Sequence, residues 1–333
     1  MDRISITEAW FAGAVSVERT ADGLKPWRIP YADYPLYPPD GIGGKAEIAA
    51  GIRLRFRTDA TQVKLLFAPL MEAAQVDCHM EGTCARTADL AQGETSAAWE
   101  GLPAGHKTVE LWLPQQVPIT IIAVYVEPGA YAEPEPDLRP RWVAYGSSIT
   151  QCVAAAGPTQ TWPAIAAHAA GLNLTCLGYS GNCQLETMVG RLIRDLPADL
   201  ITLCLGINVY GAASLSARTF RPAVIGMVQS IREKHEDTPL VLISPIYASE
   251  REDTPNKLDM TVRLIREEIA EAAALLQRRG DRALHYRDGL AWFGVDDAAH
   301  LPDGLHPDAT GYRLMGERFV ERILGDINLG SNR

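Results

Sequence analysis

The sequence predicts two domains, an antiparallel β-sandwich followed by a parallel, doubly wound α/β domain. Three observations lead to this prediction. The chain has 333 residues, more than one hydrophobic core usually accommodates. From about residue 46 to residue 128, short apolar runs are separated by turn residues. After residue 141, apolar runs instead alternate with stretches of helical periodicity.

The expected sandwich strands are short runs in which apolar and polar residues alternate. In residues 52–56, for example, Arg53 and Arg55 alternate with apolar residues, as in a strand with one buried face. Comparable runs cover residues 63–67, 109–113 and 119–126. The first 45 residues are rich in aromatic residues and proline, above all around Trp27–Tyr37. We expect them to form an arm that packs on one of the domains.

A stretch rich in proline and acidic residues, Glu127–Pro140, separates the two patterns. Proline stiffens a chain and disfavours regular structure, so this stretch has the character of a linker. We therefore place the domain boundary in it. The predicted sandwich domain covers residues 1–135, and the predicted α/β domain covers residues 136–333.

The expected strands of the α/β domain are nearly continuous apolar runs, which is typical of strands covered on both faces. They lie at residues 142–145, 174–177, 200–205, 240–243 and 283–286. Helices are expected between and after these strands, at residues 185–196, at 258–280 and at 309–324. Such a sheet carries its active site at the carboxyl ends of its strands.

Charge and composition argue against several classes of function. The formal net charge is −10, and an acidic surface repels nucleic acid and anionic lipid. We find no apolar run long enough to cross a bilayer and no signal peptide, so we expect a cytoplasmic protein without membrane or nucleic-acid partners. The cysteines match no zinc pattern and are expected as reduced thiols, at positions Cys78, Cys84, Cys152, Cys176, Cys183 and Cys204.

Polar motifs follow three of the expected strands, and a fourth motif precedes the last helix. They are Gly146-Ser147-Ser148-Ile149-Thr150, Gly178-Tyr179-Ser180-Gly181-Asn182, Gly206-Ile207-Asn208 and Asp303-Gly304-Leu305-His306-Pro307. Each motif alone has a simpler explanation, such as a helix cap, a turn glycine or a turn-forming asparagine. Their coincidence at the rim where this fold builds its site favours a catalytic explanation.

These motifs contain the groups that acyl transfer requires. A serine needs a base to act as a nucleophile at neutral pH, and His306 can supply one for Ser148. The base needs a partner that fixes its tautomer, and Asp303 lies close before it in the chain. The developing oxyanion needs hydrogen-bond donors. The backbone N–H groups of Ser148 and Gly181 and the side-chain amide of Asn208 are the candidates.

The four motifs, in this order over about residues 141–325, resemble those of the SGNH (GDSL-like) hydrolase superfamily. By this resemblance Ser148 matches the nucleophile of the Gly-Asp-Ser-Leu block. Gly181 and Asn208 match the oxyanion donors, and Asp303 and His306 match the Asp-x-x-His block. The resemblance implies a flavodoxin-like, three-layer α/β/α domain that uses no metal and no other cofactor.

The motifs depart from the family pattern at three positions. Ser147 stands where the family has aspartate, Ile149 where it has leucine, and Val209 where aspartate often follows the asparagine. These departures weaken inferences about the substrate. The two-domain layout resembles members with an N-terminal, jelly-roll-like β-sandwich. Those members include carbohydrate acetyl esterases and an acyltransferase that acts on a polyketide natural product.

Several neighbouring residues are candidates for lesser roles. Ser147 and Ser180 are alternative nucleophiles, but their positions within the motifs favour Ser148. His300 would complete a His-x-x-Asp-x-x-His set, which matches no recognised metal layout. Cys152 is expected to pack in the interior. Glu186 is expected to complement the dipole of the helix that follows it.

The substrate pocket is predicted at the loops after the third and fourth strands. The side chains there have apolar bodies that suit an acyl chain, although ordinary packing would explain them equally well. The candidate substrate-binding residues are Val209, Tyr210, Ile246 and Tyr247.

We therefore expect a serine esterase or deacylase that acts on a small-molecule or carbohydrate ester. An acyltransferase that passes the acyl group to an acceptor alcohol is the alternative. A non-catalytic carbohydrate-binding protein is the alternative of another class. A nucleotide-binding protein is disfavoured because the chain lacks the glycine-rich phosphate-binding motifs. The oligomeric state has no sequence signal.

Overall fold

The computed structural model describes residues 1–80 and 85–327, and the chain divides into two compact units. The first unit comprises Met1–Arg139 together with the short segment Ala156–Gln160. The second comprises Pro140–Ala155 and the chain from Thr161 onward. The chain therefore passes between the units near residue 140 and again on either side of the short segment.

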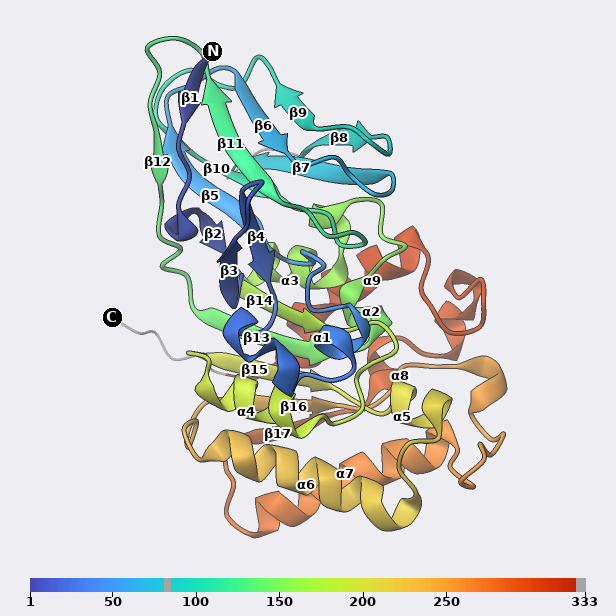
Figure 1. Cartoon of the computed structure of the whole chain (residues 1–333). Helices are drawn as coiled ribbons and strands as arrows, with labels where there is room; N and C mark the ends of the chain where they lie inside the picture. The colour runs from blue at the N-terminus through green and yellow to red at the C-terminus, as the bar shows by residue number, and fades with distance from the viewer. Residues whose placement is uncertain (81–84, 328–333) are drawn as a thin grey trace. The chain divides into compact units, whose positions relative to one another are not determined.

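The first unit is the predicted antiparallel β-sandwich (Figure 1). One sheet has the strand order β3-β4-β11-β6-β9, with β1 also paired to β11, and the other has the order β12-β5-β10-β7-β8, with β2 also paired to β5. The strands are β1 (Asp2–Ile4), β2 (Phe11–Ala12), β3 (Ser16–Arg19), β4 (Leu24–Trp27), β5 (Arg53–Thr58), β6 (Val63–Phe67), β7 (Ala74–Met80), β8 (Arg86–Leu90), β9 (Ser96–Trp99), β10 (Lys107–Trp112), β11 (Ile121–Val126) and β12 (Ala132–Pro134).

The core of this unit lies between the two sheets. Leu54 and Phe56 of β5 pack there together with Leu65 of β6 and Leu111 of β10, and all four are fully buried. The two-residue alternation seen in the sequence therefore places the apolar residues as expected.

The N-terminal segment is more regular than the expected arm. Strands β1, β3 and β4 belong to the first sheet and β2 to the second. The hairpin of β3 and β4 turns at Gly23, where an added Cβ would lie 2.3 Å from the Ile121 carbonyl oxygen of β11. The rest of the segment forms helix α1 (Asp40–Gly43) and two short 3₁₀ helices, η1 (Glu8–Trp10) and η2 (Tyr31–Leu36).

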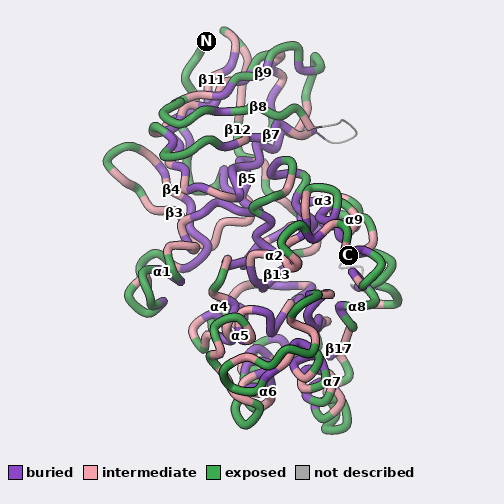
Figure 2. Tube along the Cα trace, turned by 90° about the vertical axis from the view of Figure 1, so that its right-hand side faces the viewer, coloured by how far each residue is buried: buried purple, intermediate pink, exposed green. Residues whose placement is uncertain are grey.

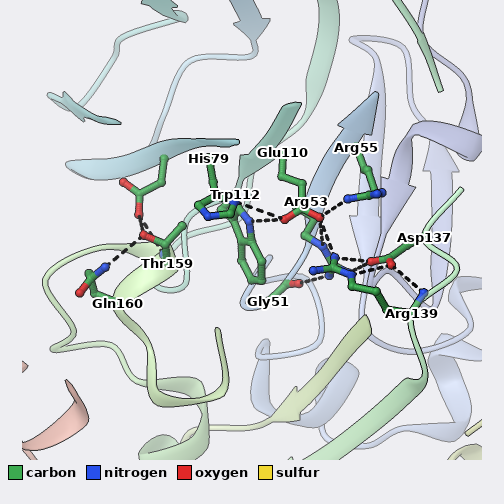
Figure 3. A network of polar contacts seen from close by, with 11 residues as sticks. Gly51, Arg53, Arg55, His79, Glu110, Trp112, Asp137, Arg139, Thr159 and Gln160 are labelled. Carbon is green, nitrogen blue, oxygen red and sulfur yellow. Dashed lines mark hydrogen bonds and ion pairs between the residues drawn. The ribbon is translucent and has the colours of Figure 1, made fainter. Parts of the chain in front are cut away.

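A buried network of charges anchors the proline-rich stretch to the second sheet (Figure 3). Arg53 of β5 is fully buried, and its Nη2 lies 2.6 Å from Asp137 Oδ2. Arg139 bridges the same carboxylate to Glu110 of β10, at 2.5 and 2.7 Å. In addition, β12 pairs with β5. The stretch is thus bound to the sandwich almost to its end.

The segment Ala156–Gln160 is held to the sandwich by one carboxylate. Asp77 of β7 is fully buried, and its Oδ2 accepts hydrogen bonds from the Thr159 N–H at 2.8 Å and from the Thr159 hydroxyl at 2.6 Å. Thr159 is labelled in Figure 3. The segment forms the 3₁₀ helix η3 (Pro158–Gln160). The backbone at Gly157 passes close to Asp77, because an added Cβ would lie 3.0 Å from the same oxygen.

The second unit is the predicted doubly wound α/β domain, with a parallel sheet of order β14-β13-β15-β16-β17. Figure 1 shows helices on both sides of this sheet. Helix α3 packs with α9, and α6 packs with both α4 and α7. The strands are β13 (Arg141–Gly146), β14 (Asn173–Gly178), β15 (Leu200–Cys204), β16 (Leu240–Ile243) and β17 (Leu284–Arg287). The central strands are buried along nearly their whole length (Figure 2).

The helices of this unit begin at recognisable caps. Thr161, Thr261 and Asp308 each accept a backbone N–H at the start of α3, α7 and α9. Helix α7 therefore starts later than expected, and Leu258 lies in the turn before it. The helices are α2 (Ser148–Gln151), α3 (Trp162–Ala170), α4 (Thr187–Asp195), α5 (Ile207–Ala212), α6 (Ala217–Arg232), α7 (Val262–Arg278), α8 (Gly289–Trp292) and α9 (Ala309–Phe319), with a π-helical turn (Val320–Leu324) after α9 and 3₁₀ helices at Ser249–Arg251 and Val295–His300.

Two further expectations concern membranes and thiols. Within residues 1–80 and 85–327, no helix combines the length and the apolar character needed to span a bilayer. The cysteines in the same residues are present as thiols, and Cys84 lies outside the described residues.

Candidate active site

The turn after β13 carries Ser148 at the start of helix α2. The backbone approaches closely in this turn, and Gly146 and Gly178 permit the approach because they have no side chain. An added Cβ would lie 2.1 Å from Thr150 Oγ1 at Gly146 and 2.5 Å from the Gln151 nitrogen at Gly178. Ser147 caps the helix by accepting the Ile149 N–H at 3.2 Å. Ser147 is thus a buried capping residue, and the Ser148 side chain remains partly exposed.

The structure brings together Ser148, His306 and Asp303, the three residues predicted to be catalytic. Ser148 Oγ lies 2.8 Å from His306 Nε2, although the two residues are 158 positions apart. On the other side of the imidazole, Nδ1 lies 2.6 Å from Asp303 Oδ2. In this arrangement the carboxylate can hold the imidazole proton on Nδ1. Nε2 is then free to accept the proton of the hydroxyl.

A tight loop holds Asp303 against His306. Gly304 has φ +70, and the loop folds back so that Asp303 Oδ1 accepts the backbone N–H groups of Leu305 at 2.9 Å and His306 at 2.7 Å. Partial burial raises the pKa of Asp303, but the hydrogen bonds from the His306 side chain and from these N–H groups outweigh it and lower the pKa to about 2. The carboxylate is therefore ionised at neutral pH.

Three hydrogen-bond donors lie at the carboxyl ends of adjacent strands. Within residues 1–80 and 85–327, the N–H groups of Ser148 and Gly181 donate to no protein acceptor. Ser148 is the first residue of α2, where the backbone N–H has no partner in its own helix. Asn208 Oδ1 accepts the Cys183 N–H at 3.0 Å, so the orientation of this amide leaves Nδ2 as a donor.

The loop that carries Gly181 is fixed by many polar contacts. The Ser180 N–H donates to Gln151 Oε1 at 3.0 Å, and Gln184 Nε2 donates to the Gly181 carbonyl at 3.2 Å. Gly181 itself has φ +74, and no atom lies within 4 Å of the position a Cβ would take. An approaching substrate therefore meets a backbone without a side chain at this point.

Glu186 is a residue of this region whose contacts the sequence analysis missed. Its Oε2 accepts the hydroxyl of Tyr145 at 2.5 Å, and its Oε1 accepts the Gln184 N–H at 2.9 Å. It makes no side-chain capping bond to helix α4. Burial raises the pKa of Glu186, and it raises the pKa of Tyr145 well above its usual range.

The four predicted pocket residues lie in different surroundings. Val209 is fully buried, and the Tyr210 hydroxyl donates to the Thr254 carbonyl at 3.0 Å. Ile246 lines an apolar cavity of about 30 Å³ together with Ile149 and Leu305, the neighbours of Ser148 and His306. A cavity of this volume holds about one water molecule and no acyl chain.

Tyr247 borders a wider, open hollow of about 580 Å³ at the carboxyl end of β16. The exposed side chains of Leu290 and Val295 border the same hollow. Nearby, Arg251 donates to the Gly304 carbonyl at 3.3 Å, which links this region to the loop of Asp303 and His306. The assignment of these residues to a substrate pocket stays a prediction.

The remaining candidates lie apart from this chain of contacts. His300 Nδ1 lies 3.4 Å from Oδ2 of Asp308, the residue that caps α9. Cys152 is fully buried at the end of α2. The Ser180 hydroxyl is buried in the loop before Gly181.

Comparison with known proteins gives two matches to family models. The GDSL-like Lipase/Acylhydrolase family matches residues 140–324, and the SsfX3 N-terminal domain matches residues 9–120. A search of curated proteins found no significant match.

Solved structures resemble the chain over nearly its whole length. A salicylyl-acyltransferase, SsfX3, from a tetracycline biosynthetic pathway is 34% identical, with a TM-score of 0.91 over 99% of both chains. A GDSL-like lipase from Bacteroides ovatus is 22% identical, with a TM-score of 0.77 over 95% of both chains. A family 2 carbohydrate esterase with a carbohydrate-binding domain, from Corynascus thermopiles, is 19% identical, with a TM-score of 0.62 over 83% of this chain and 94% of that one. The last two similarities concern the fold alone.

Proposed function

This chain belongs to the GDSL-like Lipase/Acylhydrolase family and is an ester hydrolase or acyltransferase, and from this premise we propose that it acts through an acyl intermediate on Ser148. The observation that carries the proposal is the contact series from Ser148 Oγ to His306 Nε2, at 2.8 Å, and from His306 Nδ1 to Asp303 Oδ2, at 2.6 Å.

His306 acts as the base in the first half of the proposed reaction. It accepts the Ser148 hydroxyl proton at Nε2 while Ser148 Oγ attacks the ester carbonyl carbon. Asp303 holds the proton on Nδ1 and stabilises the imidazolium that forms. His306 then returns its proton to the oxygen of the leaving alcohol, and the acyl group remains on Ser148.

The negative charge on the carbonyl oxygen is stabilised by donors already in place. The Ser148 and Gly181 N–H groups and Asn208 Nδ2 are unpaired among the described residues, and they come from three neighbouring strand ends. Donors fixed before the reaction need no rearrangement when the charge develops, and this makes them effective.

Water or an acceptor alcohol completes the second half. Deprotonated by His306, it attacks the acyl carbon and releases Ser148. We propose a small-molecule or carbohydrate ester as substrate, with hydrolysis as the main outcome. Transfer to an acceptor alcohol is the second candidate, favoured by the 34% identity to a salicylyl-acyltransferase and by the match to the N-terminal domain of the same protein.

We expect the protein to cleave p-nitrophenyl esters. Comparing kcat/KM for the acetate, butyrate and benzoate esters identifies the preferred acyl group. Because both outcomes share the acyl intermediate, release of p-nitrophenol measures its formation. The partition is measured by adding acceptor alcohols and separating acid from new ester. Acid alone with every acceptor supports hydrolysis, and new ester in proportion to acceptor supports transfer. Release that continues unchanged in Ser148→Ala would contradict the acyl-serine mechanism.

We expect Asn208→Ala to lower kcat by about 10²–10³ while KM changes little. The substitution removes one donor to the oxyanion, which is needed in the transition state and not in the ground state. Steady-state kinetics with the best ester measures the effect, and thermal unfolding checks the fold. Asn256→Ala is a matched control, since the Asn256 side-chain oxygen also accepts backbone N–H groups, those of Leu258 at 2.9 Å and Met260 at 3.1 Å. A near-normal kcat in Asn208→Ala would exclude the residue from the mechanism.

A further inference from the structure

We propose that Glu186 is a positioning residue that holds the oxyanion donors in place, an inference that rests on the proposed function. Glu186 belongs to the loop between β14 and α4 and connects this loop to β13. It reaches β13 through the Tyr145 hydroxyl, at 2.5 Å from Oε2. Tyr145 is fully buried and stands three residues before Ser148.

The second oxygen of Glu186 fixes the middle of the loop. Oε1 accepts the backbone N–H of Gln184 at 2.9 Å. A partly buried carboxylate that accepts one bond from a strand and another from a loop limits the movement of the loop relative to that strand. The strand is the one that ends at the Ser148 turn, so the loop and the nucleophile share a common support.

Gln184 and its neighbour Cys183 contact the two residues that carry the other proposed donors, Gly181 and Asn208. The side-chain Nε2 of Gln184 donates to the Gly181 carbonyl at 3.2 Å, which restrains the residue that offers an N–H to the oxyanion. Its preceding neighbour, Cys183, donates its backbone N–H to Asn208 Oδ1 at 3.0 Å and so determines which way the amide points. A shift of Gln184 would therefore disturb two of the three proposed donors together.

The backbone before Glu186 supports the same conclusion. Leu185 is a buried residue with φ +63, a left-handed conformation that a side chain such as leucine disfavours. Such a conformation persists only where the surroundings hold it, and the bond from the Gln184 N–H to Glu186 Oε1 spans Leu185. A helix-dipole role explains none of these contacts, because both carboxylate oxygens point to Tyr145 and Gln184.

The test is a double-mutant cycle between Glu186 and Asn208. We expect Glu186→Ala to lower kcat by about 10- to 100-fold with KM changed by less than about threefold, because misplacing donors by a fraction of an ångström weakens only the transition state. In the Asn208→Ala background the same substitution is expected to cost clearly less, since one of its targets is already gone. Glu186→Gln, which keeps an acceptor oxygen for one of the two donors, is expected to lie between wild type and Glu186→Ala.

The controls separate positioning from stability and from the proposed function. Asp281→Asn removes one half of the Arg232–Asp281 ion pair. Asp281 is partly buried, as Glu186 is, and it lies before β17, at the opposite end of the sheet. We expect the kcat of Asp281→Asn to stay within about twofold of wild type, even if its melting temperature falls as much as that of Glu186→Ala. If Glu186→Ala does not fold, Glu186→Gln and Tyr145→Phe provide the same comparison.

The outcomes are distinguishable. One outcome would overturn the inference and leave the proposed function intact. In it, Asn208→Ala loses activity, while the kcat values of Glu186→Gln and Glu186→Ala both stay within twofold of wild type. Fully multiplicative effects of Glu186→Ala and Asn208→Ala would also overturn it, because the two residues would then act independently. A near-normal kcat in Asn208→Ala would remove the oxyanion role itself, on which the inference depends.

Discussion

Replacing Ser148 with alanine is expected to lower kcat by about 10⁶ and to abolish covalent labelling by a fluorophosphonate. The hydroxyl is the atom that forms the acyl bond in the proposed mechanism, and its Oγ lies 2.8 Å from the base. Without it only the oxyanion donors and substrate binding remain, and these give a small residual acceleration. Gel-based labelling and single-turnover kinetics measure the two effects.

Ser147→Ala is the matched control for this substitution. Ser147 is adjacent and buried, and its hydroxyl only caps α2. Its loss is expected to cost about 1 kcal/mol of stability and to leave labelling in place. Labelling that disappears in Ser147→Ala and persists in Ser148→Ala would show that the nucleophile has been assigned to the wrong residue.

Replacing Asp303 with asparagine is expected to lower kcat by about 10⁴ without unfolding the loop. The amide oxygen can still accept the N–H groups of Leu305 and His306, so the local turn is preserved. The amide nitrogen then faces His306 Nδ1 and donates to it, which forces the ring proton onto Nε2. In that tautomer the ring cannot accept the Ser148 proton.

The comparison is made at pH 7–8, where the wild-type carboxylate is fully ionised because its pKa is about 2. Asp308→Asn is the control, because the Asp308 side chain caps α9 and lies 3.4 Å from His300 Nδ1. Asparagine is as good a cap as aspartate, so kcat should stay within a few-fold of wild type. Equal kcat in Asp303→Asn and wild type would show that Asp303 does not orient the base.

The sequence was most informative where one residue pattern has one structural meaning. The buried runs at residues 142–145 and 200–205 correspond to β13 and β15, because a strand covered on both faces needs apolar residues at every position. The motifs after these strands then converge, since parallel strands end at one rim. The proximity of Ser148 to His306 follows from that topology.

Prediction was poorer where the role of a residue depends on a distant partner. Arg53 looked like the solvent face of a strand, but it is buried because Glu110 and Asp137 neutralise it. Glu186 looked like a helix-dipole residue, yet its partner Tyr145 is 41 positions away. Neither partner could be identified from local periodicity.

The strands of the N-terminal region were also missed, because they are short and lack an alternating pattern. Strands β3 and β4 have only four residues each, and β4 contains a proline and a tryptophan in place of an alternating pattern. Strand β3 is held by pairing with β4, and β4 by pairing with β3 and β11, so composition alone suggested an irregular arm.

The excursion of Ala156–Gln160 into the sandwich means that the two units are not separable by a single cut in the chain. A recombination event that exchanged the N-terminal module at Arg139 would also remove Asp77, the acceptor of both Thr159 hydrogen bonds. The new module would have to bring an equivalent carboxylate, because the recipient still carries these five residues between Ser148 and helix α3. A chimeric protein that joins residues 140–333 to another sandwich therefore needs a carboxylate in the position of Asp77 to keep the Thr159 bonds.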